Sequence, residues 1–362
     1  MDTWATLIKT MDPDVHFTIV LEKETDLQTV HKLMKSHKFP NPERFHFIMC
    51  NDINITMWSR DQMVGLFGPT DDAVLLAQTT MRPHGQDPLI PPRIVAANKG
   101  IVLDPDKRLV TDGGDEVSNR RETFLGYTSL YLTAQHLHDL SGAKTSFKDE
   151  ENTWLLKARA LFEEKYGKPV TVIGADDPTT PEIERPATFH IDMGLTPVDD
   201  NTILVGDPRE AIKIIQSLPK DEYEAYNKKL RDVLGESGDV LQRLMDANTI
   251  HDPDLQHQFD YNADHLRGKG YNVIRMPFLQ GPPGVSWITY NNCLMETYTR
   301  PDGSDVRRVF LPTYGLPALD RKAEEIYNSQ GFQVIPLNLA SLTTWKGAIR
   351  CISNILGKQP EA

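Results

Sequence analysis

Cys351 combines with three upstream motifs to suggest nucleophilic chemistry. The motifs are Trp58-Ser59-Arg60-Asp61, Asp112-Gly113-Gly114-Asp115 and Phe189-His190-Ile191-Asp192. A thiolate can attack an electrophilic carbon, and carboxylates hold a planar cation through charge-assisted hydrogen bonds. Together these residue types favour a thiol nucleophile that acts on a cationic carbon.

The two carboxylate motifs each have an ordinary structural interpretation as well. Asp61 follows a strand predicted to end near Cys50, where it can accept two hydrogen bonds from a cationic fork or simply pair with an arginine at the surface. Asp112 to Glu116 is typical of a polar turn in which the glycines allow close backbone approach. A calcium loop is an alternative for this turn, but it lacks the EF-hand spacing.

His190 and Asp192 lie in a strand-like run, so alternation predicts both side chains on one face. His190 there can transfer protons, although a half-exposed polar strand face is the simpler alternative. Asn292 ends another predicted strand and is a candidate for lining a pocket. Cys293 is followed by apolar residues and is predicted to pack in the core.

The ordered set Asp61, Asp112, His190, Asp192, Asn292 and Cys351 resembles the guanidino-group-modifying enzymes of the pentein superfamily. Their pattern is Trp-x-Arg-Asp, an acidic residue before Gly-Gly, His-x-Asp and a C-terminal Cys. The resemblance spans roughly residues 45 to 356, and its C-terminal third is similar to agmatine deiminases and bacterial peptidyl-arginine deiminases. It implies one catalytic domain over residues 1–362, folded as a five-bladed α/β propeller of repeated ββαβ units.

The resemblance also implies a role for each site residue. Asp61 and Asp192 would bind the guanidinium group, Cys351 would attack its carbon, and His190 would act as acid and then as base. Asp112 would orient His190 or contact the substrate. Further substrate contacts are expected from Trp58, Asp115 and Asn292. The product would be a ureido compound plus ammonia, formed without a metal or organic cofactor.

Two residues depart from the family pattern. Asp112 stands where Glu is frequent, and Arg350 stands where agmatine deiminases carry His before the nucleophile. The substrate therefore stays open between agmatine, arginine and the arginine side chain of a peptide. Two other functions also stay open: an amidinotransferase that uses the same Cys-amidino intermediate, and a noncatalytic binding protein with the pentein fold.

The elements that must position these residues alternate between strand and helix, which predicts an α/β fold. Helices that end at Gly167, Gly270 and Gly331 are each followed three residues later by a β-branched strand. Glycine accepts the left-handed conformation at a helix end, so the chain can turn directly into the strand. Asp207-Pro208 is typical of a helix start.

Composition limits the partners. The 362 residues carry 39 basic and 51 acidic side chains, and the net charge of −12 argues against nucleic acid or an anionic membrane as a partner. Three scattered cysteines favour neither a disulfide framework nor a cysteine metal site. We expect a cytoplasmic protein, or a secreted one if a leader has been removed, and a homo-oligomer is compatible with the sequence.

Overall fold

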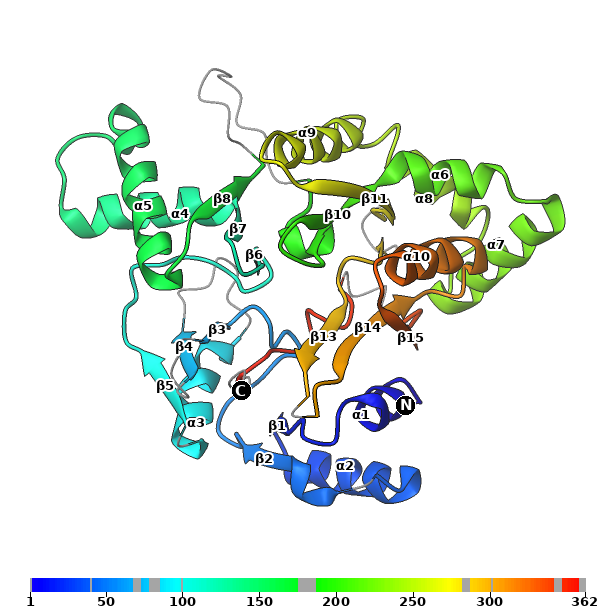
Figure 1. Cartoon of the computed structure of the whole chain (residues 1–362), viewed down its shortest axis with the longest axis horizontal. Coiled ribbons are helices and arrows are strands. Elements are labelled where there is room, and N and C mark those ends of the chain that lie inside the picture. The colour runs from blue at the N-terminus through cyan, green and yellow to red at the C-terminus, as the bar shows by residue number, and fades with distance from the viewer. Residues whose placement is uncertain are drawn as a thin grey trace.

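The computed structural model describes residues 2–39, 41–67, 73–77, 85–98, 100–174, 187–281, 287–300, 302–341 and 347–357. The described strands form five separate sheets with the orders β1-β2, β3-β4-β5, β6-β7-β8, β12-β11-β10-β9 and β13-β14-β15. In Figure 1 these sheets surround a common centre, and most helices lie on their outer side.

The strands are short, and their bounds in chain order are β1 Phe17–Leu21, β2 Phe45–Met49, β3 Met63–Phe67, β4 Ala73–Ala77, β5 Ile101–Asp104, β6 Glu116–Ser118, β7 Thr123–Gly126, β8 Val170–Ile173, β9 Leu195–Pro197, β10 Thr202–Asp207, β11 Asn272–Leu279, β12 Ile288–Thr289, β13 Leu294–Thr299, β14 Asp305–Thr313 and β15 Gln333–Asn338.

The helices connect the strands, and their bounds are α1 Asp2–Thr10, α2 Glu24–His37, α3 Ile90–Ala97, α4 Tyr127–Ser141, α5 Glu151–Tyr166, α6 Pro208–Gln216, α7 Lys220–Leu234, α8 Val240–Ala247, α9 Leu255–Gly268 and α10 Pro317–Ser329. Four 3-10 turns accompany them, namely η1 Pro42–Arg44, η2 Asp87–Leu89, η3 Phe147–Asp149 and η4 Ile191–Met193.

Four of the sheets repeat one unit. An antiparallel pair of strands is followed by one or more helices and then by a strand parallel to the second of the pair, as in β6-β7 and β8. The same order holds for β3-β4-β5, β9-β10-β11 and β13-β14-β15. The predicted ββαβ repeat is therefore present in these sheets. The β1-β2 sheet differs, because its described strands form only a parallel pair across α2.

Local signals in the sequence position several of these elements as predicted. Gly167, Gly270 and Gly331 all have positive φ, at 65°, 90° and 79°, which a glycine adopts without a Cβ clash. The Asp207 side chain accepts a hydrogen bond from the Glu210 backbone N–H and caps α6. Cys293 is 4% exposed in the largest apolar cluster, so its predicted core packing is confirmed.

The strand prediction for His190 to Asp192 is wrong. His190 has extended backbone, but residues Ile191–Met193 form the 3-10 turn η4. Met193 N–H donates to the His190 carbonyl at 3.2 Å, and Asp192 N–H donates to the Gly114 carbonyl at 3.1 Å. One bond within the turn and one tertiary bond to Gly114 replace a strand ladder, so the turn rather than strand alternation directs the two side chains.

The core consists of several apolar clusters rather than one. The largest packs α6, α7, α8 and α10 against the β9 to β12 and β13 to β15 sheets. A second cluster contains Cys351 and Met193 together with residues of β10 and α9. Among the described residues, no helix has both the length and the apolar character needed to cross a bilayer.

Candidate active site

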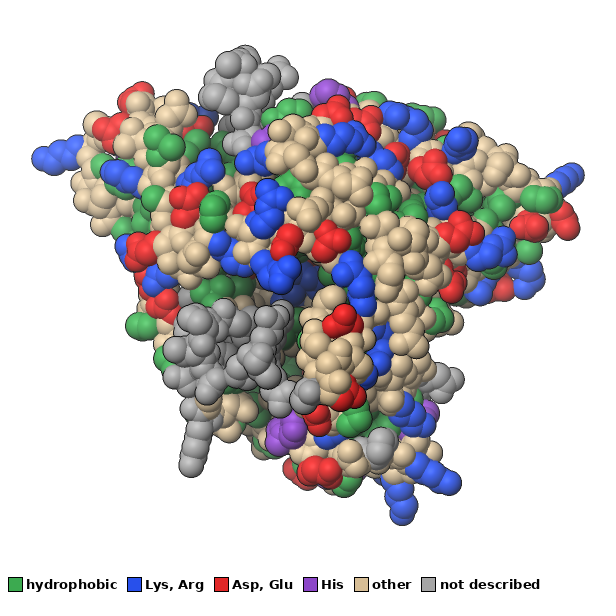
Figure 2. Space-filling model, viewed as in Figure 1, with side chains coloured by type: hydrophobic (Ala, Val, Ile, Leu, Met, Phe, Trp, Pro, Cys, Tyr) green, Lys and Arg blue, Asp and Glu red, His purple; other side chains and the backbone are tan. Residues whose placement is uncertain are grey.

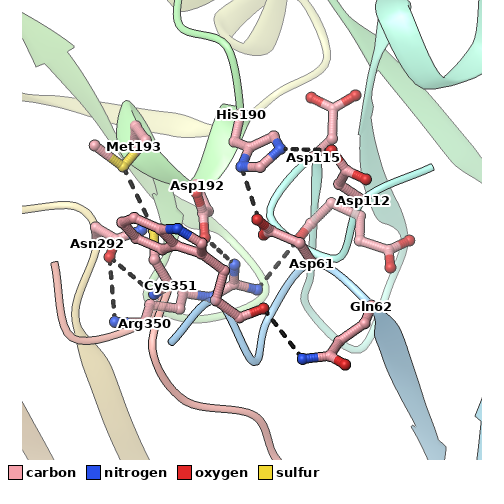
Figure 3. A network of polar contacts seen from close by, with 12 residues as sticks. Asp61, Gln62, Asp112, Asp115, His190, Asp192, Met193, Asn292, Arg350 and Cys351 are labelled. Carbon is pink, nitrogen blue, oxygen red and sulfur yellow. Dashed lines mark hydrogen bonds and ion pairs between the residues drawn. The ribbon is translucent and has the colours of Figure 1, made fainter. Parts of the chain in front are cut away.

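His190 lies between two carboxylates from distant parts of the chain. Its Nε2 donates to Asp112 Oδ2 at 3.1 Å, and its Nδ1 lies 3.8 Å from Asp61 Oδ1. All three side chains are buried, and Figure 3 shows the imidazole directed at both carboxyl groups. Burial opposes protonation, but the Asp112 hydrogen bond and the charges of Asp61 and Asp192 raise the pKa of His190 above its usual value. The site therefore favours the imidazolium form.

The short Asp112 side chain reaches His190 because the Gly113-Gly114 turn approaches its neighbours closely. A Cβ on Gly114 would lie 2.5 Å from His190 Nδ1, and a Cβ on Gly113 would lie 2.9 Å from the Met63 carbonyl oxygen. Real Cβ atoms do not make such contacts. The glycine pair thus brings the acidic turn against both η4 and the segment before β3.

Asp192 already binds a guanidinium group, that of Arg350. Arg350 Nη1 donates to Asp192 Oδ2, and Nη2 donates to the Glu116 backbone oxygen at 3.1 Å. Asp192 is fully buried, whereas the Arg350 side chain keeps 15% of its surface exposed. The other carboxyl oxygen, Asp192 Oδ1, is buried and accepts no hydrogen bond among the described residues.

Asn292 holds the backbone of residues 347–354, named the nucleophile segment because Cys351 is the predicted nucleophile. Its Oδ1 accepts hydrogen bonds from the Arg350 N–H at 3.1 Å and from the Cys351 N–H at 3.3 Å. Asn292 comes from the turn between β12 and β13. The amide thereby fixes the position of Cys351 in a segment that has no regular secondary structure.

The Cys351 thiol faces apolar surroundings. It is 2% exposed, lies in the cluster that contains Ile191 and Trp287, and its Sγ lies 3.8 Å from Met193 Sδ. Burial, together with the charges of Asp192 and Asp61, raises the pKa of Cys351 above its usual value. The Cys351 thiol is therefore neutral near pH 7.

Trp58 and Arg60 join the first motif to the nucleophile segment. The Trp58 ring packs on Gly347, where a Cβ would lie 2.5 Å from Trp58 Cζ3. Arg60 N–H donates to the Cys351 carbonyl at 3.2 Å, and Arg60 Nη1 donates to Asn354 Oδ1 at 2.9 Å. Burial and the nearby Arg350 charge lower the pKa of Arg60 to about 9.

Asp115 is the last residue of the Asp112-Gly113-Gly114-Asp115 turn, and its side chain contacts α4. Its Oδ2 accepts from the Ser129 hydroxyl at 2.5 Å and from the Ser129 backbone N–H at 3.3 Å, in the first turn of α4. Burial raises the pKa of Asp115 to about 6. Its predicted contact with substrate stays a prediction.

The structure thus brings Trp58, Asp61, Asp112, Asp115, His190, Asp192, Asn292 and Cys351 to one region, as Figure 3 shows for the labelled members. Sequence reasoning missed the contact of Arg350 with Asp192 and that of Met193 with the thiol. Met193 directly follows His190-Ile191-Asp192, and this adjacency was the available signal. The described residues contain no group of three His, Cys, Asp or Glu side chains arranged to hold a metal ion.

Comparisons with known proteins agree with this arrangement at the level of the fold. No protein-family model matches the chain, and no curated protein matches its sequence significantly. Solved structures do match. Agmatine deiminase of C. jejuni, solved as a variant with substrate bound, is 12% identical with a TM-score of 0.59, over 99% of this chain and 87% of the other.

Two further structures match similarly. Agmatine deiminase of Enterococcus faecalis is 12% identical with a TM-score of 0.55, over 97% of this chain and 86% of the other. A structure reported as a candidate peptidyl-arginine deiminase, with no organism given, is 13% identical with a TM-score of 0.58, over 99% and 90%. The chain therefore has the α/β fold of these deiminase structures, so the predicted α/β class is confirmed.

Proposed function

We propose that the protein is a guanidino deiminase that hydrolyses a guanidino group to a ureido product and ammonia through a covalent Cys351 intermediate. The observation that carries the proposal is the placement of His190 between Asp112 and Asp61, in one site with Asp192 and Cys351. The resemblance of the fold to agmatine deiminases supports it.

The first half of the reaction starts from a protonated His190 and a neutral Cys351 thiol. The substrate guanidinium binds at Asp61 and Asp192, and its positive charge lowers the pKa of the nearby Cys351 thiol, which releases its proton to water. The resulting thiolate forms a bond with the guanidinium carbon. The imidazolium of His190 gives its proton to one nitrogen, which leaves as ammonia, and an amidino thioether cation remains on Cys351.

The second half of the reaction is hydrolysis. The now neutral His190 takes a proton from water, and the oxygen bonds to the same carbon as the carbon–sulfur bond breaks. The remaining proton on this oxygen passes to the departing thiolate, so the ureido product is released, the Cys351 thiol is restored and His190 is again protonated. Asp112 orients the imidazole throughout through its hydrogen bond at 3.1 Å, and no step needs a cofactor.

We also propose that the five sheets are five blades of an α/β propeller, and that residues 1–362 form one catalytic domain around the central site. The ββαβ unit in four of the sheets supports this interpretation. The cytoplasmic location, the absence of nucleic acid and membrane partners, and the homo-oligomer remain predictions.

An assay of ammonia and ureido product tests the proposed activity. The wild-type protein is incubated with arginine, agmatine, N-methylated arginines and an arginine-containing peptide. We expect ammonia and one ureido product, and we expect Cys351→Ala to lose at least about 10³-fold in rate with an unchanged melting temperature. Undiminished turnover in that variant would exclude the covalent mechanism.

Two alternatives give different outcomes in the same assay. An amidinotransferase produces a new guanidino compound when an amine acceptor is added, without releasing ammonia. A noncatalytic pentein-fold binding protein converts none of the compounds. No observation in the structure favours either alternative over hydrolysis.

A further inference from the structure

The Arg350 guanidinium lies where the proposed function places part of the substrate. Asp192 is one of the two carboxylates assigned to the substrate guanidinium, yet its Oδ2 is bound by Arg350 Nη1. The other oxygen, Asp192 Oδ1, is buried and has no hydrogen-bond partner in the described part of the chain. A substrate guanidinium that binds both carboxyl oxygens of Asp192 must therefore displace the Arg350 guanidinium.

The replacement has an electrostatic cost. Breaking a buried ion pair by removing one partner is strongly unfavourable, because the remaining charge loses its counter-ion. Arg60 is a second, half-buried cation close enough for the Arg350 charge to lower its pKa. An incoming cation thus meets two resident guanidinium groups, and the displaced Arg350 needs a new anionic partner.

The Arg350 side chain can move without moving the nucleophile. Its backbone N–H and that of Cys351 are held by Asn292 Oδ1. The side chain, in contrast, is partly exposed and is held at its tip by Asp192 and the Glu116 backbone oxygen. Rotation of the side chain breaks these two tip contacts and leaves the backbone bonds intact.

We propose that the substrate is a guanidino acid. Its guanidinium displaces Arg350 and binds Asp192, and its carboxylate binds the displaced Arg350. This inference rests on the proposed deiminase activity and specifies its substrate class. The exchange conserves the number of ion pairs in the site. A guanidino amine such as agmatine offers no anion, so it leaves Arg350 unpaired and adds a further positive charge nearby.

Figure 2 shows Lys and Arg side chains near the centre of the face that Figure 1 views, with Asp and Glu side chains beside them. Arginines attract a carboxylate and bind it through two parallel hydrogen bonds. Arg350 therefore has the chemistry of a specificity-determining residue.

Three substrates of similar length test the inference. They are 4-guanidinobutanoate, agmatine and n-butylguanidine, which share the guanidinium and end in an anion, a cation and a methyl group. For the wild-type protein we expect kcat/KM for the acid to exceed that for agmatine by at least about tenfold, which corresponds to one ion pair. Butylguanidine should lie between them.

Arg350 variants then show whether this residue causes the preference. Arg350→Ala should reduce the acid-to-agmatine ratio at least about tenfold and increase kcat/KM for agmatine, because no resident guanidinium competes for Asp192. Arg350→Lys keeps the cation and should keep most of the preference. A wild-type preference for agmatine, or a ratio that Arg350→Ala leaves unchanged, would overturn the inference.

A probe of Cys351 separates this inference from the proposed function. Chloroacetamidine carries an amidinium group and alkylates thiols, and chloroacetamide is its neutral counterpart. The quantity measured is the rate of Cys351 alkylation by chloroacetamidine divided by the rate with chloroacetamide, followed by mass spectrometry in folded protein. We expect Arg350→Ala and Arg350→Gln each to raise this ratio at least about fivefold over wild type. An unchanged ratio means that Arg350 does not compete at Asp192 and overturns the inference.

The substrate panel shows whether the guanidino-acid inference fails alone or the proposed deiminase function fails with it. Turnover of butylguanidine with no preference for the acid overturns only the guanidino-acid assignment. Absence of a ureido product from every compound with every variant overturns the deiminase function as well.

Discussion

The His190 side of the site favours a charged side chain, whereas the Cys351 side favours a neutral one. On one side His190 lies between Asp112 and Asp61, which raise its pKa. On the other side the Cys351 thiol contacts Met193, and burial raises the thiol pKa. Figure 3 shows Met193 and Cys351 on the opposite side of the site from Asp112. These directions leave the His190 imidazole protonated and the Cys351 thiol neutral without substrate, and in the proposed reaction a bound cation is needed to form the thiolate.

Removal of the Asp112 charge should disturb the histidine side most. In Asp112→Asn the imidazolium loses its carboxylate partner, so the pKa of His190 should fall, because burial then has less opposition. We expect kcat to fall by about 10²-fold or more, in line with loss of general acid catalysis. The pKa is measured by NMR titration of the imidazole. Asp112→Glu, which keeps the charge, is the control, and an unchanged pKa in the Asn variant would contradict the assignment.

Asp61→Asn should act mainly on substrate binding. One charge-assisted hydrogen bond to a guanidinium contributes about 1.5–3 kcal/mol, so we expect KM to rise about 10- to 100-fold. Asp61 also lies 3.8 Å from His190, and a smaller fall in kcat should accompany the change. Steady-state kinetics separate the two effects. A change in kcat with an unaltered KM would place Asp61 with the proton-transfer group rather than the binding group.

Changes at Asn292 should affect the thiol side more weakly. Asn292→Ala leaves the N–H groups of Arg350 and Cys351 without their acceptor, which costs about 1–3 kcal/mol of unfolding free energy. We expect kcat to fall by about tenfold. Asn292→Asp keeps an acceptor but adds a negative charge near the thiol, so it should slow alkylation of Cys351 by iodoacetamide. An unchanged alkylation rate in the Asp variant would show that the added charge does not affect the thiol.

Asp115 should affect stability rather than catalysis. Its pKa is raised from 3.8 to about 6 in the folded protein, so folding favours the protonated form. Stability is therefore lost as pH rises from about 4 to 6, by about 3 kcal/mol. Asp115→Asn should be more stable than wild type at pH 8 and equal to it near pH 4, as measured by urea unfolding. The exposed Asp232→Asn should change stability by less than about 0.5 kcal/mol. A loss of stability at pH 8 in Asp115→Asn would show that the carboxylate is needed in its charged form.

Features that depend on short stretches of sequence were predictable. Glycines at helix ends, the Asp207 cap and the β-branched strands each act through neighbours a few residues away. The motif order also predicted which residues would gather around His190. The strand assignment at His190 failed because tertiary bonds to Gly114 replace the expected ladder.

The partner of Asp192 was beyond sequence reasoning. Arg350 was visible as a departure from the family pattern, but its guanidinium meets a carboxylate 158 positions away. Spacing along the chain does not specify which of several arginines takes such a partner. The exposure of Cys351 and the raised pKa of Asp115 likewise depend on packing that only the structure describes.

The bonds between Arg60 and the nucleophile segment have a consequence for folding. Arg60 contacts Asn354 across 294 positions of sequence, and its N–H donates to the Cys351 carbonyl. Contacts of such sequence separation form slowly, because the entropy of closing a long loop must be lost first. During refolding, helical circular dichroism should recover before enzymatic activity does. Cys351 then reaches its place only after the segments that contact it have folded, so we expect partly folded chains to lack the assembled thiol site.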